Sequence, residues 1–311
     1  MIIVCLLDTN LKKMFNFANK KTTFMDRKTN MKLSTRLLVL LWLMGIGLIV
    51  ASVACVLVVK WGMLTMLTVQ DVLAFIAPAV LAMALFYRRP LHAMCLDRAP
   101  GWKAIIVVLL FYLVSLPAMN WLVTLNESMT LPAGLSGIEQ WMRASEDAAA
   151  QTTKELLDIN TIGELLACTF VVGLMAGVSE EMLFRGAMLR TMQDSRLGTH
   201  AVVWIVAIIF SAFHMQFFGF LPRMLLGVWL GYLFVWSRSL WVPIIAHTLN
   251  NSTVVLFSYL TGIGLIPEGY GDSLGLPAEG AFPWFALLSL AASILLALWA
   301  AKHITPRQVE D

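Results

Sequence analysis

Long uninterrupted runs of apolar residues restrict this chain more than any other feature of its sequence. They cover residues 37–59, 72–87, 104–125, 162–178, 201–217, 224–236, 240–260 and 282–301. About 20 helical residues cross the ~30 Å hydrocarbon core of a bilayer, since each adds about 1.5 Å. The runs are continuous rather than alternating, which favours helices over a β-barrel. We therefore predict an all-α polytopic membrane protein with about eight transmembrane helices in one bundle.

The composition agrees with this prediction. Of the 311 residues, 59% are hydrophobic and 13% are charged, whereas a soluble domain averages about 25% charged residues. The net charge of +3 is small, and we expect no nucleic-acid partner. The cysteines have no paired spacing, so neither a disulfide framework nor a zinc knuckle is indicated.

Charge between the runs predicts the orientation of the chain. Residues 1–36 carry eight lysines and arginines against two aspartates, and basic segments of this kind lie on the cytoplasmic side of a membrane. The segment 126–161 is acidic and is expected outside, partly as a surface helix near residues 138–157. Both termini are therefore predicted to be cytoplasmic.

We predict one transmembrane domain at 37–303, a basic cytoplasmic tail at 1–36 and a short cytoplasmic tail at 304–311. The expected location is the plasma (inner) membrane, as an integral protein. Two lone arginines stand out in this scheme. Arg223 falls on the outer side, and Arg185 is expected to be buried beside an acid.

Two adjacent glutamates, Glu180 and Glu181, follow the fourth run, close to the inner boundary of the membrane. An acid at the centre of a transmembrane helix costs roughly 2.5 to 3.5 kcal/mol, so such residues usually face a bundle interior or a wet cavity. A helix brings Glu181 and Arg185 onto one face as an ion pair, while Glu180 points about 100° away. One carboxylate is thus predicted to be structural and the other free for chemistry. Alternatively, Ser179 caps a helix and both acids are solvated at its start.

Polar residues also interrupt two later apolar runs. Phe210 and His214 lie in the fifth run, and His247 and Asn251 lie four residues apart on one helical face of the seventh. A single intramembrane histidine is more often a hydrogen-bonded packing residue than a catalyst. Three helices that each carry a costly polar group at similar depth, however, indicate a buried active site.

These side-chain types suit hydrolysis. A carboxylate shielded from bulk water, such as Glu180, can act as a general base toward a water molecule. His214 can hold that water or move its proton. Donors on His247 and Asn251 can stabilise the oxyanion that forms on a peptide carbonyl. No serine or cysteine lies in a recognisable nucleophile motif.

The patterns Glu-Glu-x-x-x-Arg, Phe-x-x-x-His and His-x-x-x-Asn, in this order on transmembrane helices, resemble the CPBP family. This family includes the CAAX prenyl proteases and the bacteriocin-processing or Abi proteins. The resemblance covers roughly residues 162–259 and implies an eight-helix intramembrane endopeptidase. Its substrate would be a membrane-embedded or lipidated peptide or protein.

By position, the resemblance also implies a role for each motif residue. The water activator is Glu180 and the water partner is His214, while His247 and Asn251 form the oxyanion site. The supporting residues are Glu181, Arg185 and Phe210.

Two alternatives stay open. The family is often labelled metalloprotease, and Glu180, His214 and His247 could form a three-ligand zinc site. We prefer a metal-free mechanism, because there is no His-Glu-x-x-His motif and a water held by acid and imidazole needs no ion. The protein could instead be a non-catalytic binding or immunity protein, or a transporter, that uses the same buried polar groups. The substrate and the oligomeric state are not indicated.

A Gly-x-x-x-Gly pattern lies in the sixth run, at Gly227 and Gly231. Small residues at this spacing let two helix backbones approach closely. We predict that the pattern serves packing within the bundle rather than dimerisation.

Overall fold

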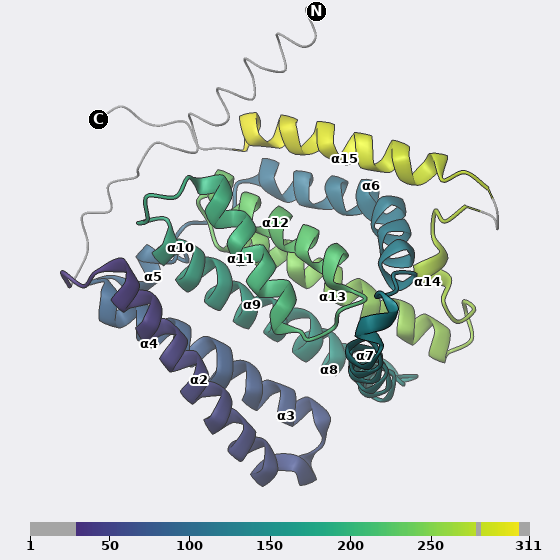
Figure 1. Cartoon of the computed structure of the whole chain (residues 1–311), viewed down its shortest axis with the longest axis horizontal. Coiled ribbons are helices and arrows are strands. Elements are labelled where there is room, and N and C mark those ends of the chain that lie inside the picture. Colours follow the sequence, from purple (N-terminus) through teal and green to yellow (C-terminus); the bar gives the residue numbers. More distant parts are fainter. Residues whose placement is uncertain (1–28, 278–280, 305–311) are drawn as a thin grey trace, which may run out of the picture.

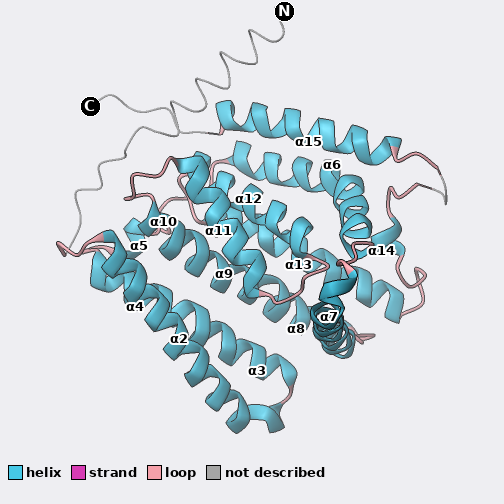
Figure 2. Ribbon diagram, viewed as in Figure 1, coloured by secondary structure: helices cyan, strands magenta, loops and turns pink. Residues whose placement is uncertain are grey.

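The computed structural model describes residues 29–277 and 281–304, which form a bundle of helices with no strand among them (Figure 2). Figure 1 shows α6 and α15 along one side and α2, α3 and α4 along the opposite side, with the remaining long helices between them. The α-helices are α2 (Leu33–Val58), α3 (Met63–Gln70), α4 (Ala77–Phe86), α5 (Pro90–Ala93), α6 (Trp102–Glu127), α7 (Ser136–Leu156), α8 (Ile162–Cys168), α9 (Ala176–Glu181), α10 (Arg190–Met192), α11 (Thr199–Phe213), α12 (Phe220–Ser237), α13 (Trp241–Gly262), α14 (Tyr270–Ser273) and α15 (Trp284–His303).

Several of these helices run into one another without a break. Within the described residues, six continuous helices are long and apolar enough to cross a membrane: Leu33–Trp61, Met63–Phe86, Trp102–Glu127, Ile162–Met192, Phe220–Ser237 and Trp284–His303. Helix α11 is shorter, and α13 has enough length but is polar from His247 to Thr253. All eight predicted runs fall on these helices, which confirms an all-α polytopic membrane protein.

Three predicted boundaries differ from those of the structure, and in the first two a polar residue inside a helix was read as its end. The second span begins at Met63 instead of 72 and includes Asp71. The fourth runs on to Met192, so the two glutamates lie inside the helix rather than at its end. The fifth helix ends at Phe213 instead of 217, and His214 directly follows it. Neighbouring side chains take the place of water around these polar groups.

The last residues of the predicted basic tail are helical. Helix α2 begins at Leu33, and Arg36 lies inside it with only 4% of its surface exposed. The Arg36 guanidinium donates to Asp194 Oδ2 at 2.8 Å and to the Tyr87 hydroxyl at 3.3 Å. Its acidic partner is 158 residues away, so no local charge pattern reveals the pair. The rest of the predicted tails, residues 1–28 and 305–311, lies outside the described part of the chain.

The Gly-x-x-x-Gly pattern packs α12 against α11. A Cβ atom on Gly231 would lie 2.9 Å from Val203 Cγ1, and one on Gly227 would lie 3.2 Å from Ala207 Cα. Such short distances mean that only a glycine lets the two helices come this close. The packing role predicted for the pattern is confirmed.

The predicted surface helix is present as α7. None of its residues is buried, and the apolar side chains of Ile138 and Trp141 are exposed. In Figure 1 it is seen nearly end-on, whereas α2, α6 and α15 lie across the view. An amphipathic helix at right angles to spanning helices is typical of the lipid–water boundary.

Candidate active site

The helix from Ile162 to Met192 carries the two glutamates between two π-helical stretches, η4 (Thr169–Met175) and η5 (Met182–Leu189). A third π-helical stretch, η2 (Asp71–Ile76), packs against α9 from the second span. The wider turns of a π-helix are frequent at functional sites within helices. The α9 segment between them is thus a place where function is expected.

Glu181 and Arg185 form a fully buried ion pair, with both side chains 0% exposed and Arg185 Nη1 2.5 Å from Glu181 Oε1. Arg185 Nη2 also donates to the Gly227 carbonyl at 2.9 Å. The guanidinium lies 4.7 Å from the centre of the Phe210 ring, a cation–π distance. The predicted pair is therefore present, and the alternative in which both acids are solvated at a helix start is wrong.

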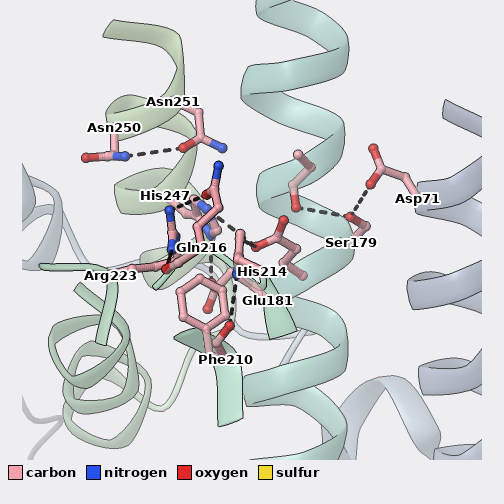
Figure 3. A network of polar contacts seen from close by, with 12 residues as sticks. Asp71, Ser179, Glu181, Phe210, His214, Gln216, Arg223, His247, Asn250 and Asn251 are labelled. Atoms are coloured by element: carbon pink, nitrogen blue, oxygen red, sulfur yellow. Dashed lines mark hydrogen bonds and ion pairs between the residues drawn. The ribbon is translucent and has the colours of Figure 1, made fainter. Parts of the chain in front are cut away.

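Each histidine is oriented by a hydrogen bond through its Nδ1 atom. His247, 3% exposed, places Nδ1 at 2.9 Å from Glu181 Oε1, and His214 places Nδ1 at 2.9 Å from the Phe210 carbonyl (Figure 3). A carbonyl or carboxylate at Nδ1 requires the proton on that atom, because these oxygens only accept. The Nε2 atom of each ring is left for another partner.

Both Nε2 atoms face the carboxylate of Glu180. Its Oε2 atom lies 3.8 Å from His247 Nε2 and 3.9 Å from His214 Nε2. This oxygen is buried and has no hydrogen-bond partner among the described residues. A water molecule about 2.8 Å from each of these three atoms could donate to two of them and accept from the third when that nitrogen carries a proton. Three helices that are distant in sequence thus supply one cluster, as the motifs predicted.

Asn251 is less free than a dedicated oxyanion donor would be. Its Nδ2 donates to the Val172 carbonyl at 3.1 Å. Its Oδ1 accepts from Asn250 Nδ2 at 3.3 Å (Figure 3). An amide nitrogen carries two hydrogens, so one remains available. These contacts fix the orientation of the amide, and its oxyanion role stays a prediction.

Asp71 is a residue of this region that the sequence analysis missed. It is buried, with 7% of its surface exposed, and its Oδ1 accepts from the Ser179 hydroxyl at 2.9 Å (Figure 3). Ser179 directly precedes Glu180 in the chain. The sequence contained a signal for its burial, because an acid inside an otherwise apolar stretch usually faces the bundle interior.

A zinc ion at this site would have Glu180, His214 and His247 as its ligands. A tetrahedral zinc ion with bonds of about 2.0 Å holds its ligand atoms about 3.3 Å apart, whereas Glu180 Oε2 lies 3.8 and 3.9 Å from the two Nε2 atoms. No group of three or more metal-ligating side chains is found in the part of the chain that the structure describes. The carboxylate oxygen is thus about 0.5 Å farther from each nitrogen than two ligands of one tetrahedral zinc ion would be.

Gly177 sets the distance between the glutamates and His247. A Cβ atom at this position would lie 2.8 Å from Thr248 Oγ1 and 3.2 Å from Thr248 N. We expect Gly177→Ala to push α13 away, to lower stability by about 1–3 kcal/mol and to lower any activity. Gly163→Ala on the same helix is the matched control, because a Cβ there meets nothing within 4 Å. Equal unfolding midpoints for the two variants would contradict this account.

The fold and the cluster define a polytopic helical membrane protein with a buried glutamate–histidine site. Residues 162–253 match the family described as type II CAAX prenyl endopeptidase Rce1-like. This match confirms the resemblance predicted from the three motifs. It includes Glu180, Glu181, Arg185, Phe210, His214, His247 and Asn251, but not Asp71.

Two curated relatives were found by sequence. The chain is 33% identical over 97 residues to the membrane-embedded CAAX protease MroQ of Staphylococcus aureus, and 32% identical over 83 residues to the uncharacterized protein YpbD of Bacillus subtilis. These alignments cover 29% and 25% of this chain and 39% of each relative. No solved structure matches. The chain thus matches about two fifths of the length of each relative.

Proposed function

We propose that this protein is an intramembrane endopeptidase of the CAAX protease type, which hydrolyses a peptide bond in a membrane-embedded or lipidated peptide or protein. One observation carries the proposal: imidazoles from two other helices converge on the unpartnered Oε2 atom of Glu180. Such an arrangement suits a shared water molecule that Glu180 can deprotonate.

In this mechanism Glu180 removes a proton from the shared water as the water oxygen attacks the carbonyl carbon. His214 orients the water, because its unprotonated Nε2 atom accepts the second water hydrogen. Glu180 then passes its proton to the amide nitrogen as the carbon–nitrogen bond breaks. A new carboxyl end and a new amine end result.

The oxyanion of the tetrahedral intermediate needs donors. His247 lies between the carboxylates of Glu180 and Glu181, with Nε2 3.8 Å from the first and Nδ1 2.9 Å from the second. As an imidazolium it donates from both ring nitrogens. Its Nε2–H and the remaining amide hydrogen of Asn251 are the donors we assign to this charge. Each such donor is worth roughly 3 to 4 kcal/mol in known enzymes.

The test is cleavage of a membrane-tethered peptide by the purified full-length protein in lipid nanodiscs, followed by mass spectrometry. A prenylated peptide, a leader peptide and a membrane-protein stub are compared as probes. We expect at least one to be cut at a defined bond. Binding of a probe without cleavage would favour the non-catalytic alternative.

We expect the reaction to persist without metal. Prolonged dialysis against a tight chelator, followed by metal analysis, should leave the cleavage rate within about twofold of its starting value, because Glu180 and His214 hold the water themselves. Activity that is lost on dialysis and restored by zinc would overturn the metal-free mechanism.

The charge distribution supports an orientation with both termini in the cytoplasm, and the membrane we propose is the plasma (inner) membrane. In this orientation the chain from Ile162 to Met192 returns from the outer to the inner side. Labelling of cysteines introduced near Arg98 and near Gln140, with a membrane-impermeant reagent on intact cells, tests both sides.

A further inference from the structure

Arg223 lies in the first turn of α12, and neither the topology nor the mechanism gives it a task. Its guanidinium is held by one residue, Gln216: Nη1 donates to the backbone carbonyl at 3.3 Å and Nη2 to the side-chain oxygen at 2.5 Å (Figure 3). Both acceptors are neutral. Among the described residues, no carboxylate oxygen lies within 4.0 Å of an Arg223 nitrogen, the distance that defines an ion pair.

The position of this cation relates it to the cluster. Figure 3 draws Arg223 and Gln216 beside His214 and His247, and the ionisable groups near the guanidinium are Glu180, His214 and Glu146. The Glu146 carboxylate is already engaged, since its Oε2 accepts from the backbone N–H of Phe218 at 3.1 Å. The guanidinium is therefore close enough to the catalytic candidates to influence them, yet its charge is not neutralised by a direct partner.

The residues around Arg223 make room for its guanidinium and leave some of its N–H donors without a partner. Gly219 makes room for the guanidinium, because a Cβ there would lie 3.1 Å from Nη2. Asn126 fixes the start of α12 by accepting from the Leu221 N–H at 2.8 Å. A guanidinium has five N–H donors, of which Gln216 uses two. Three donors and a full positive charge remain in a partly buried place, where carboxylates are bound well.

We infer that Arg223, held by Gln216, binds a carboxylate of the substrate peptide close to the scissile bond. The inference rests on the proposed function, because it treats the bound peptide as substrate. The carboxylate belongs either to a free C-terminus or to an acidic side chain. Arg223 is then a specificity-determining residue that favours acidic over neutral peptides.

The experiment uses four membrane-tethered peptides that differ at two places only. The C-terminus is either a free acid or an amide, and the residue beside the cleaved bond is either glutamate or glutamine. The four peptides combine these choices. Their dissociation constants are measured with the full-length Glu180→Gln variant in nanodiscs, which removes turnover. We expect the fully neutral peptide to bind about tenfold more weakly than the better acidic one, as one charged hydrogen-bonded contact would give. When Arg223→Gln is added, the acidic and neutral peptides should bind equally well.

The ratio between peptides is measured within each protein preparation, so partial misfolding of a variant cancels. Arg143→Gln is the matched control: it removes an arginine from the same side of the protein, but one already paired with Glu139 at 2.8 Å. In the active protein, Arg223→Gln should raise KM for the acidic peptide and leave kcat unchanged.

The outcomes separate the hypotheses. Loss of discrimination with the amide terminus identifies the chain end as the partner, and loss with glutamine identifies the side chain. Equal binding of all four peptides, or discrimination that survives Arg223→Gln, overturns the inference. If the active protein cleaves none of the peptides while Arg223-dependent discrimination persists, the carboxylate site stands and the protease proposal fails.

Discussion

Replacing Glu180 with glutamine is expected to lower kcat/KM for peptide cleavage by roughly three orders of magnitude, the contribution of a well-placed general base. Glutamine keeps the shape of the side chain but cannot accept the proton of the water. Because Glu180 makes no hydrogen bond through Oε2, the fold should survive the change. The measurement is cleavage of a membrane-tethered peptide, with the unfolding midpoint recorded in parallel.

Glu155→Gln is the matched control for this substitution. Glu155 is exposed on α7, where it accepts from Gln151 at 2.7 Å, so the same chemical change there should leave the rate unaltered. Cleavage by the Glu180→Gln variant at the wild-type rate, with a normal unfolding midpoint, would remove Glu180 from the mechanism.

Replacing Arg185 with methionine is expected to destabilise the protein by about 3–5 kcal/mol, the effect of leaving a buried charge without its partner. The charge in question is the carboxylate of Glu181, which has 0% exposure. Arg143→Met tests the same arginine–glutamate spacing at an exposed pair on α7, where about 0.2–1 kcal/mol is expected. Detergent-induced unfolding measures both.

A double variant, Glu181→Leu with Arg185→Met, should regain most of the lost stability, because an apolar pair of similar size replaces the charges. It should not regain activity, since His247 then lacks the acceptor at its Nδ1 atom. A double variant that is as active as the wild type would contradict the positioning role of Glu181.

Run length and apolar continuity were enough to predict the helices, because a bilayer selects for both properties along the chain itself. The Glu181–Arg185 pair was also predictable, since one helical turn fixes its geometry. The meeting of Glu180, His214 and His247 was suggested by their shared high cost in a membrane, although spacing along a helix says nothing about contacts between helices.

Contacts across the bundle explain most of what was missed. Asp71 and Ser179 are 108 residues apart, and each looks like a helix boundary when its neighbours in sequence are all that is known. Arg36 was missed for a similar reason: in sequence it resembles the lysines before it, but it lies inside the protein. The contact of Asn251 with the Val172 carbonyl involves a π-helical stretch, whose extra residue per turn no pattern of apolar residues announces.

Helix α7 rests on the short connection that follows His214. Glu146 accepts from the Phe218 N–H, Arg143 lies 4.2 Å from the Phe218 ring centre, and the Trp141 and Phe217 rings are 5.2 Å apart. An element whose apolar residues face the headgroups responds to lateral pressure and to the thickness of the surrounding bilayer. We therefore expect the rate of the proposed cleavage to differ between thin and thick membranes.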